Sequence, residues 1–111
     1  MSRLAHDPDV WPPLRTITDI AARGMNVRLR CPGCHYERVL NGPGLWWLFH
    51  RRQWDDDMRE AARRLRCSRC WIRDRRKQRP ALEQTRDDPT GEPLPDPDAA
   101  EWKRLVARYR C

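Results

Sequence analysis

The sequence predicts a small α+β fold built around paired cysteines, and three observations lead to it. Two C-x-x-C pairs, Cys31 with Cys34 and Cys67 with Cys70, are separated by 32 residues. Residues 26–30 (Asn-Val-Arg-Leu-Arg) alternate apolar and polar side chains, as a half-buried strand does. Between the two pairs, apolar residues recur at helical spacing. We therefore expect a β-hairpin at the first pair and helices inserted before the second.

The four cysteines of these pairs predict one metal site. Two residues between cysteines allow a tight turn to place both sulfur atoms on the same ion, and four thiolates suit tetrahedral Zn²⁺. Four thiolates also fill the coordination shell, so no position stays open for water or a substrate. We expect Cys31, Cys34, Cys67 and Cys70 to hold one structural Zn²⁺ per chain.

Other uses of the cysteines are less favoured or stay open. Residues 31–35 (Cys-Pro-Gly-Cys-His) also match the C-x-x-C-H of covalent haem attachment, but the N-terminal residues lack the apolar run of an export signal. The same observation disfavours two disulfides, because thiols stay reduced in a reducing compartment. No βαβ pattern surrounds the first pair, as a thioredoxin-like redox pair would require. Iron in a rubredoxin-like site stays open, since four thiolates also bind iron.

Two further groups of polar residues could in principle form additional sites. His35 follows a ligand, but with four cysteines available we expect it to be solvated or to pack against the protein. Asp55, Asp56 and Asp57 are consecutive, so their carboxylates would point in different directions on a helix, and we expect them to cap one. No arrangement typical of catalysis remains, and the chain is predicted not to be an enzyme.

Composition limits the size of the core. The chain has 111 residues, 39% hydrophobic and 35% charged, which predicts one domain with a modest core. We expect metal binding to supply part of its stability. Six tryptophans add large apolar area, and most of them should lie in the core. No apolar run approaches the roughly 20 residues of a membrane span, so a cytoplasmic protein with no membrane partner is expected.

Composition also divides the chain into four segments. They are an irregular N-terminal arm (residues 1–17), a metal-binding domain with a helical insertion (18–79), a proline-rich linker without a fixed fold (80–97) and a C-terminal helix (98–111). At the start of the domain, Thr18 and Gly24 are typical of the N-cap and the end of a short helix. Residues 26–30 then lead into the first cysteine pair and residues 37–40 lead out of it. These two stretches predict a hairpin whose turn holds metal.

The insertion between the cysteine pairs predicts two helices. Residues 41–44 (Asn-Gly-Pro-Gly) end the hairpin, and Leu45, Leu48 and Phe49 then share one helical face. A second helix is expected over residues 55–64, with acidic residues in its first turn, where the helix dipole favours them. After it, Leu65-Arg66 and Trp71-Ile72 flank the second cysteine pair, and we expect them to close a small ribbon.

The C-terminal segment predicts an amphipathic helix. Residues 98–101 (Asp-Ala-Ala-Glu) have the character of a capping box. Trp102, Leu105, Val106 and Tyr109 follow at positions i, i+3, i+4 and i+7, so they form one apolar face. We expect this face to fold back onto the same chain, with docking on another protein as the alternative. Cys111, the fifth cysteine, is expected to be a free thiol.

Residues 27–75 resemble a zinc ribbon with a helical insertion. Residues 19–31 (Asp-Ile-Ala-Ala-Arg-Gly-Met-Asn-Val-Arg-Leu-Arg-Cys) and 64–70 (Arg-Leu-Arg-Cys-Ser-Arg-Cys) resemble stretches of small, largely uncharacterised bacterial zinc-ribbon proteins. Such ribbons commonly carry glycine after the second cysteine of a pair, where the backbone is left-handed, whereas His35 and Trp71 stand there in this chain. The resemblance implies a module that binds nucleic acid or docks in transcription and translation assemblies.

Basic character is concentrated around the second cysteine pair. The formal net charge is +7. From Arg59 to Arg79 the sequence has ten Lys or Arg residues and only two acidic residues, Glu60 and Asp74. Such density favours contact with phosphates, because neutralising them releases counterions, and guanidinium groups can also stack on bases. The expected contacts to DNA or RNA are Arg63, Arg64, Arg66, Arg69, Arg73, Arg75, Arg76, Lys77 and Arg79.

Two function classes stay open, beside a solvated basic face that binds nothing. The first is a non-enzymatic module that binds nucleic acid through its Arg-rich face, as a transcription- or translation-associated regulator. The alternative is a protein-docking adaptor in a larger assembly. It would use the helical face of Trp102, Leu105, Val106 and Tyr109 together with exposed tryptophans.

Overall fold

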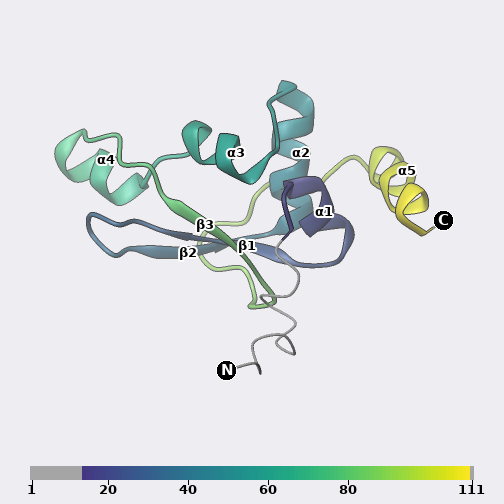
Figure 1. The fold of residues 1–111 in the computed structure, drawn as a ribbon, viewed down its shortest axis with the longest axis horizontal. Coiled ribbons are helices and arrows are strands. Elements are labelled where there is room, and N and C mark those ends of the chain that lie inside the picture. The colour runs from purple at the N-terminus through teal and green to yellow at the C-terminus, as the bar shows by residue number, and fades with distance from the viewer. Residues whose placement is uncertain (1–13, 111) are drawn as a thin grey trace.

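The structure, a computed structural model, describes residues 14–110 apart from the side chain of residue 110. The expectations for residues 1–13 and for Cys111 lie outside the described residues. Figure 1 shows an α+β arrangement in which helices lie over a small sheet. The elements are α1 (Ile17–Ala22), β1 (Asn26–Arg30), β2 (Glu37–Leu40), α2 (Gly42–Arg52), α3 (Met58–Arg64), α4 (Ser68–Asp74), β3 (Ala81–Thr85) and α5 (Ala99–Arg110).

The three strands form one antiparallel sheet in the order β2-β1-β3. The predicted hairpin is confirmed, and Val27 of β1 lies opposite Leu40 of β2. Because side chains alternate along a strand, Val27 and Leu29 join the apolar core while Arg28 and Arg30 project from the other face. β1 therefore has one face toward the helices and one polar face.

Helix α1 begins earlier than the sequence predicted. Its N-cap is Thr16, whose Oγ1 accepts a hydrogen bond from the backbone N–H of Asp19 at 3.1 Å. Thr18, the expected cap, lies inside the helix and donates its hydroxyl to the carboxylate of Asp56. The prediction was wrong because both threonines fit the N-cap pattern. Only the earlier start buries Ile17, which is fully enclosed in the core.

The insertion forms the two predicted helices. Asn41 is the N-cap of α2 and accepts a hydrogen bond from the N–H of Gly44 at 2.8 Å. Leu45 and Phe49 of this helix are buried, as their spacing predicted. Helix α3 is shorter than the expected range of 55–64, because Asp57 ends the preceding loop as its N-cap.

The third strand lies in the segment expected to be a linker without a fixed fold. Ala81–Thr85 pair with β1 along its whole length, so that expectation is wrong for these residues. The chain after the strand is also attached, since the N–H of Thr90 donates to the carbonyl of Val39 at 2.9 Å. The prolines that dominated the composition lie on either side of β3 and leave room for the strand between them.

Helices α1, α2 and α3 lie over the sheet, and α5 lies beside α1 at the opposite end of the molecule from α4 (Figure 1). The buried core residues are Ile17, Ile20, Ala21, Met25, Val27, Leu40, Leu45, Trp46, Phe49, Ala61 and Leu105. Trp47, Trp54 and Trp102 pack against them while partly exposed, which places four tryptophans at the core. Within residues 14–110, no helix has both the length and the apolarity needed to cross a membrane.

Helix α5 packs on its own chain, as expected. Leu105 is only 2% exposed, and the rings of Trp102 and Trp46 meet edge to face with centroids 5.6 Å apart. Asp98 begins the helix by accepting a hydrogen bond from the N–H of Glu101 at 3.1 Å, which confirms the capping half of the predicted box. Two aromatic rings and one leucine therefore attach α5 to the core.

Candidate metal centre and basic groove

The fold brings the two cysteine pairs together at one end of the molecule. The Sγ atoms of Cys31 and Cys70 are 3.6 Å apart, as are those of Cys34 and Cys67, and all four lie within 4.8 Å of one another. Ligands of a tetrahedral zinc ion with Zn–S bonds of about 2.3 Å are separated by about 3.8 Å. The predicted ligand set is therefore assembled with spacings that fit a four-thiolate metal site.

Each cysteine pair has the same local structure. The N–H of Cys34 donates to the Sγ of Cys31, and the N–H of Cys70 donates to the Sγ of Cys67, both at 3.4 Å. One residue further, the N–H groups of His35 and Trp71 donate to the carbonyls of the first cysteine of each pair. The two N–H···S bonds, from Cys34 to Cys31 and from Cys70 to Cys67, orient the sulfur atom of the first cysteine in each pair and would stabilise a thiolate on it.

After the second cysteine the two pairs diverge. His35, which follows the second cysteine of the first pair, has a φ of 63°. This is the left-handed conformation that glycine adopts most easily. After it the chain turns back into β2. Trp71 instead continues a helix, because Cys67 is the N-cap of α4 and Cys70 lies in its first turn. Trp71 and Ile72 therefore belong to α4, and the prediction that they close a ribbon is wrong. The C-x-x-C spacing fits a hairpin turn and a first helical turn equally well.

The surroundings shift the pKa values of three thiols, those of Cys31, Cys67 and Cys70, in different directions. Burial disfavours a thiolate at Cys31, but N–H donors from Cys34 and Gly33 outweigh it and lower the pKa to about 7. Burial raises the pKa of Cys67, and it raises that of Cys70 to about 12. Neighbouring sulfur atoms add to the effect at Cys70, because like charges at this spacing oppose each other. Four thiolates can therefore coexist here only beside a compensating cation.

The other polar groups named from the sequence have structural roles. Asp57 caps α3 through the N–H of Arg59, and this bond is the main cause that lowers the pKa of its carboxyl. Asp55 accepts the N–H of Asp57 and Asp56 binds Thr18, so the three carboxylates act separately. Among residues 14–110, the cysteines form the only group arranged to hold a metal ion.

A basic groove of about 720 Å³ lies between α3 and α4. We call it the α3–α4 groove, and its lining comprises Arg63, Arg64, Leu65, Arg66, Ser68, Trp71, Ile72, Lys77 and Arg79. Five of the nine predicted nucleic-acid contacts thus share one surface, and no acidic residue lines it. The apolar lining was missed as part of the site, because Leu65, Trp71 and Ile72 were expected to close a ribbon. Its position next to the second cysteine pair and the arginines was the available signal.

The cations of this groove are largely unneutralised. Arg63 has Glu60 at 3.9 Å, whereas Arg64, Arg66, Lys77 and Arg79 have no carboxylate within ion-pair distance among the described residues. Two guanidinium groups lie over tryptophan rings instead. Arg66 is 4.2 Å from the centroid of Trp71, and Arg64 is 5.1 Å from that of Trp54. Such contacts hold the cations in place without cancelling their charge.

The remaining four predicted contacts lie outside the groove lining. Arg69 lies over the ring of Tyr36, and Arg75 lies over Trp71 at 5.6 Å. Arg73 forms an ion pair with Asp74 at 3.0 Å, and Arg76 is exposed beyond the end of α4. Of the nine predicted contacts, five therefore line the groove and four lie outside its lining.

The predicted docking face of α5 is partly used within the chain. Leu105 is buried and Trp102 meets Trp46, while Tyr109 is 44% exposed and donates its hydroxyl to Asp19 at 2.8 Å. Val106 lines a shallow hollow of about 740 Å³ on the helix surface, beside Trp102 and Lys103. Most of the apolar face of α5 is therefore used to attach the helix to the rest of the chain.

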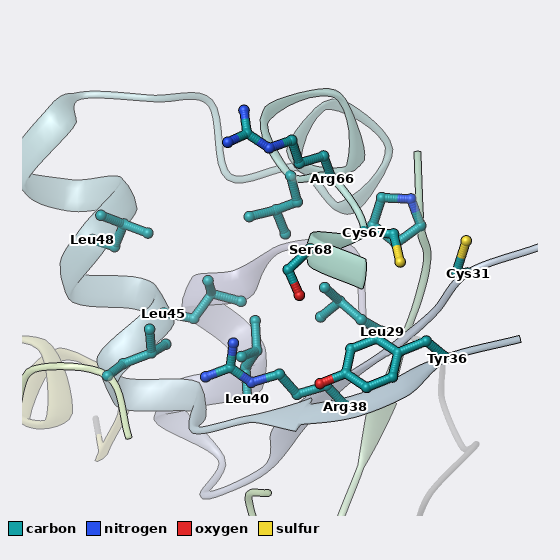
Figure 2. A pocket seen from close by; sticks show the side chains of 13 residues that line it. Leu29, Cys31, Tyr36, Arg38, Leu40, Leu45, Leu48, Arg66, Cys67 and Ser68 are labelled. Carbon is teal, nitrogen blue, oxygen red and sulfur yellow. The ribbon is translucent and has the colours of Figure 1, made fainter. Parts of the chain in front are cut away.

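A small apolar cavity of about 150 Å³ separates the core from the cysteines. Figure 2 shows leucines of α2 and of the sheet on its sides, with Cys31 and Cys67 at one end. Arg66 borders both this cavity and the α3–α4 groove. The cysteine cluster thus touches the apolar core through few side chains, with open space between them.

Comparisons with protein-family models, with curated proteins and with solved structures found no match to this chain. The resemblance to bacterial zinc-ribbon proteins stays a prediction.

Proposed function

We propose that this chain is a non-enzymatic module that binds nucleic acid, with one structural zinc ion holding its basic groove in place. The observation that carries the proposal is the α3–α4 groove, where four of five cations lack an acidic partner in the described part of the chain. Like charges gathered in one groove repel one another, so the arrangement costs stability unless a polyanion neutralises them. Phosphates of nucleic acid supply that neutralisation along a line.

Zinc is the proposed metal because its ligand preference matches the site. Four thiolates satisfy its tetrahedral shell and leave no open position, so the ion would have a structural role. Its place explains its importance for binding: Cys67 and Cys70 begin α4, and residues 68–79 contribute Ser68, Trp71, Ile72, Lys77 and Arg79 to the groove. The four described cysteines are free thiols, which suits the reducing cytoplasm as the compartment.

Metal analysis of the purified full chain tests the first half of the proposal. We expect close to one zinc per chain and no visible absorption of an iron–thiolate site. The double variant Cys31→Ser with Cys67→Ser removes one ligand from each pair and should lose the metal. Purified protein with neither zinc nor iron would contradict the proposed site, and stoichiometric iron would replace zinc in it.

The docking alternative has less support. Three of its four residues are engaged within the chain, namely Trp102, Leu105 and, through its hydroxyl, Tyr109. A partner would therefore find mainly Val106 and the hollow beside it. Docking through α5 would also leave the unpaired cations of the α3–α4 groove without a role. It predicts binding that depends on α5 and responds little to salt.

Matched charge variants test the second half. One variant replaces Arg66, Lys77 and Arg79 with Gln in the groove, and the control replaces Lys103, Arg104 and Arg108 with Gln on α5, at the other end of the molecule (Figure 1). Both lose three positive charges, so non-specific attraction falls equally. If the groove contacts phosphates, only the groove variant should flatten the slope of log affinity against log salt, by about 0.7 to 0.9 per lost contact.

The readout is fluorescence anisotropy of a labelled oligonucleotide titrated with zinc-loaded protein between low and physiological salt. Equal effects of the two variants would mean that net charge, rather than the groove, attracts the probe. If the wild type does not bind at low salt, the nucleic-acid proposal fails.

A further inference from the structure

The lining of the α3–α4 groove combines apolar and cationic side chains. Leu65, Trp71 and Ile72 line it together with the basic residues, and Ile72 is 75% exposed although it belongs to a helix. A surface that meets only phosphates has no need of exposed apolar side chains, because apolar contact with a strongly hydrated charged group is not stabilising. The groove is therefore built for a ligand that has both charged and apolar faces.

Trp71 and Arg66 form a stacking platform within this groove. The guanidinium of Arg66 lies 4.2 Å from the centroid of the Trp71 ring, and among the described residues no carboxylate engages it. A planar guanidinium that an aromatic ring holds on one face keeps its other face for a further planar group. Bases stack on aromatic rings and on arginine planes in this way, whatever their sequence.

The mixed lining bears on the form of nucleic acid that the groove can take. Its volume of about 720 Å³ has room for one or two nucleotides. A duplex keeps its base faces stacked inside and offers a protein its phosphates and groove edges. A single strand brings the flat faces of its bases to the surface together with its phosphates.

We infer that the α3–α4 groove takes single-stranded nucleic acid, with bases against Trp71, Arg66 and Ile72 and phosphates against Lys77 and Arg79. This inference rests on the proposed function and makes it more specific.

The test compares a labelled 12-nucleotide single strand of mixed sequence with the same strand annealed to its complement, both titrated with zinc-loaded full chain at one salt concentration. We expect the single strand to bind at least about tenfold tighter, since stacking of even one base has an effect of this size. Ile72→Ala should reduce that preference several-fold and is compatible with folding, because Ile72 is exposed and alanine favours a helix. Trp71→Leu should reduce it further, and Val106→Ala on α5 is the matched apolar control.

The outcomes separate this inference from the function on which it rests. Equal or tighter binding of the duplex would overturn the single-strand inference while nucleic-acid binding stands. A single-strand preference that survives both Ile72→Ala and Trp71→Leu would also overturn it, because the contact would lie elsewhere. Binding of neither probe at low salt would remove the proposed function itself. Zinc content and far-UV circular dichroism of each variant show whether its fold is intact.

Discussion

The two ends of this molecule are held by different physical means. At the core end, side chains from α1, α2, α3, α5 and the sheet bury one another, and residues such as Ile17, Ile20 and Phe49 are almost wholly enclosed. At the cysteine end, formed by residues 31–36 and 67–78, the buried cluster consists of Cys31, Cys67 and Cys70 with only Cys34 and Tyr36 against it. One end has an apolar core, and the other has ligands for an ion.

The difference shows where function can be placed. Apolar burial stabilises the core end without any ligand, whereas the cysteine end has too little apolar area to compensate the entropy of its ordered loops. The groove that we propose for nucleic acid is built largely on the cysteine end. Its order should therefore depend on the metal, while the core end serves as the scaffold.

Removal of the metal should have the largest effect and should separate the two ends. Structural zinc contributes on the order of 10 kcal/mol in small modules, so a chelator should release α4 and the hairpin turn. Hydrogen exchange should then lose protection at the amides of Cys31 and Cys67, which bond to Tyr36 and Gln78. The amide of Met25, bonded to Ile20, should stay protected. Simultaneous loss of all protection would show one cooperative unit and contradict the comparison.

Added methyl groups should distinguish tight packing at the core end from looser packing at the cysteine end. A Cβ on Gly42 would lie 2.1 Å from the carbonyl oxygen of Met25, and a backbone atom cannot move aside cheaply. Gly42→Ala should therefore destabilise the protein by about 3 kcal/mol or more, measured by urea unfolding of the zinc-loaded chain. Gly33→Ala is the control, because its Cβ would meet only the flexible side chain of Gln78 at 3.4 Å. Similar losses in both variants would mean that the two ends pack alike.

The core end was partly predictable because its signals are local. The hairpin, the start of α2 and the face of α5 each follow from residues a few positions apart, such as Asn41 with Gly44 or Trp102 with Leu105. β3 was missed because its five residues gain their order from β1, with Leu82 opposite Leu29. A pairing across more than 50 residues leaves little trace in composition, whereas flanking prolines dominate it.

At the cysteine end the sequence predicted the ligands but not their supports. The four thiols cluster as expected, because the spacing within each pair places two sulfur atoms side by side and the fold then joins the pairs. The same spacing does not distinguish a hairpin turn from the first turn of a helix, and α4 is a helix because Cys67 caps it. The basic stretch was visible, but only the fold determines that Arg66 and Lys77 share a groove while Arg73 pairs with Asp74.

Truncation of Trp102 should have an intermediate effect, confined to the core end. Its ring contacts Trp46 and is partly exposed, so Trp102→Ala should cost about 2 kcal/mol, somewhat less than a fully buried aromatic. For a domain of this size, the melting temperature should fall by roughly 10 °C. Ile72→Ala, the exposed control on α4, should leave it unchanged. An unaltered melting temperature with loss of self-association would mean that α5 docks on another chain.

The smallest effect concerns the contact that ties α5 to α1, and its pH dependence should be opposite to that of the cysteine end. The hydroxyl of Tyr109 donates to Asp19 at 2.8 Å, and burial, followed by this bond, raises the pKa of Tyr109 above its usual value near 10. A raised folded-state pKa means that the stabilisation is fully present below about pH 10 and is lost as pH rises through the folded pKa. Tyr109→Phe should therefore cost about 0.5–1 kcal/mol at pH 8, the usual value of one hydrogen bond.

Urea unfolding of wild type and Tyr109→Phe from pH 8 to pH 11 would measure this difference. The gap should stay constant up to about pH 10 and then close, because the phenolate can no longer donate to Asp19. The cysteine end should respond in the other direction, since protons compete with the metal for thiolates as the pH falls. Acid should thus release the groove while α5 stays attached, and alkali should loosen α5 while the metal centre persists. A gap near zero at every pH would show that the hydroxyl contributes nothing, and the attachment of α5 would then rest on Leu105 and Trp102 alone.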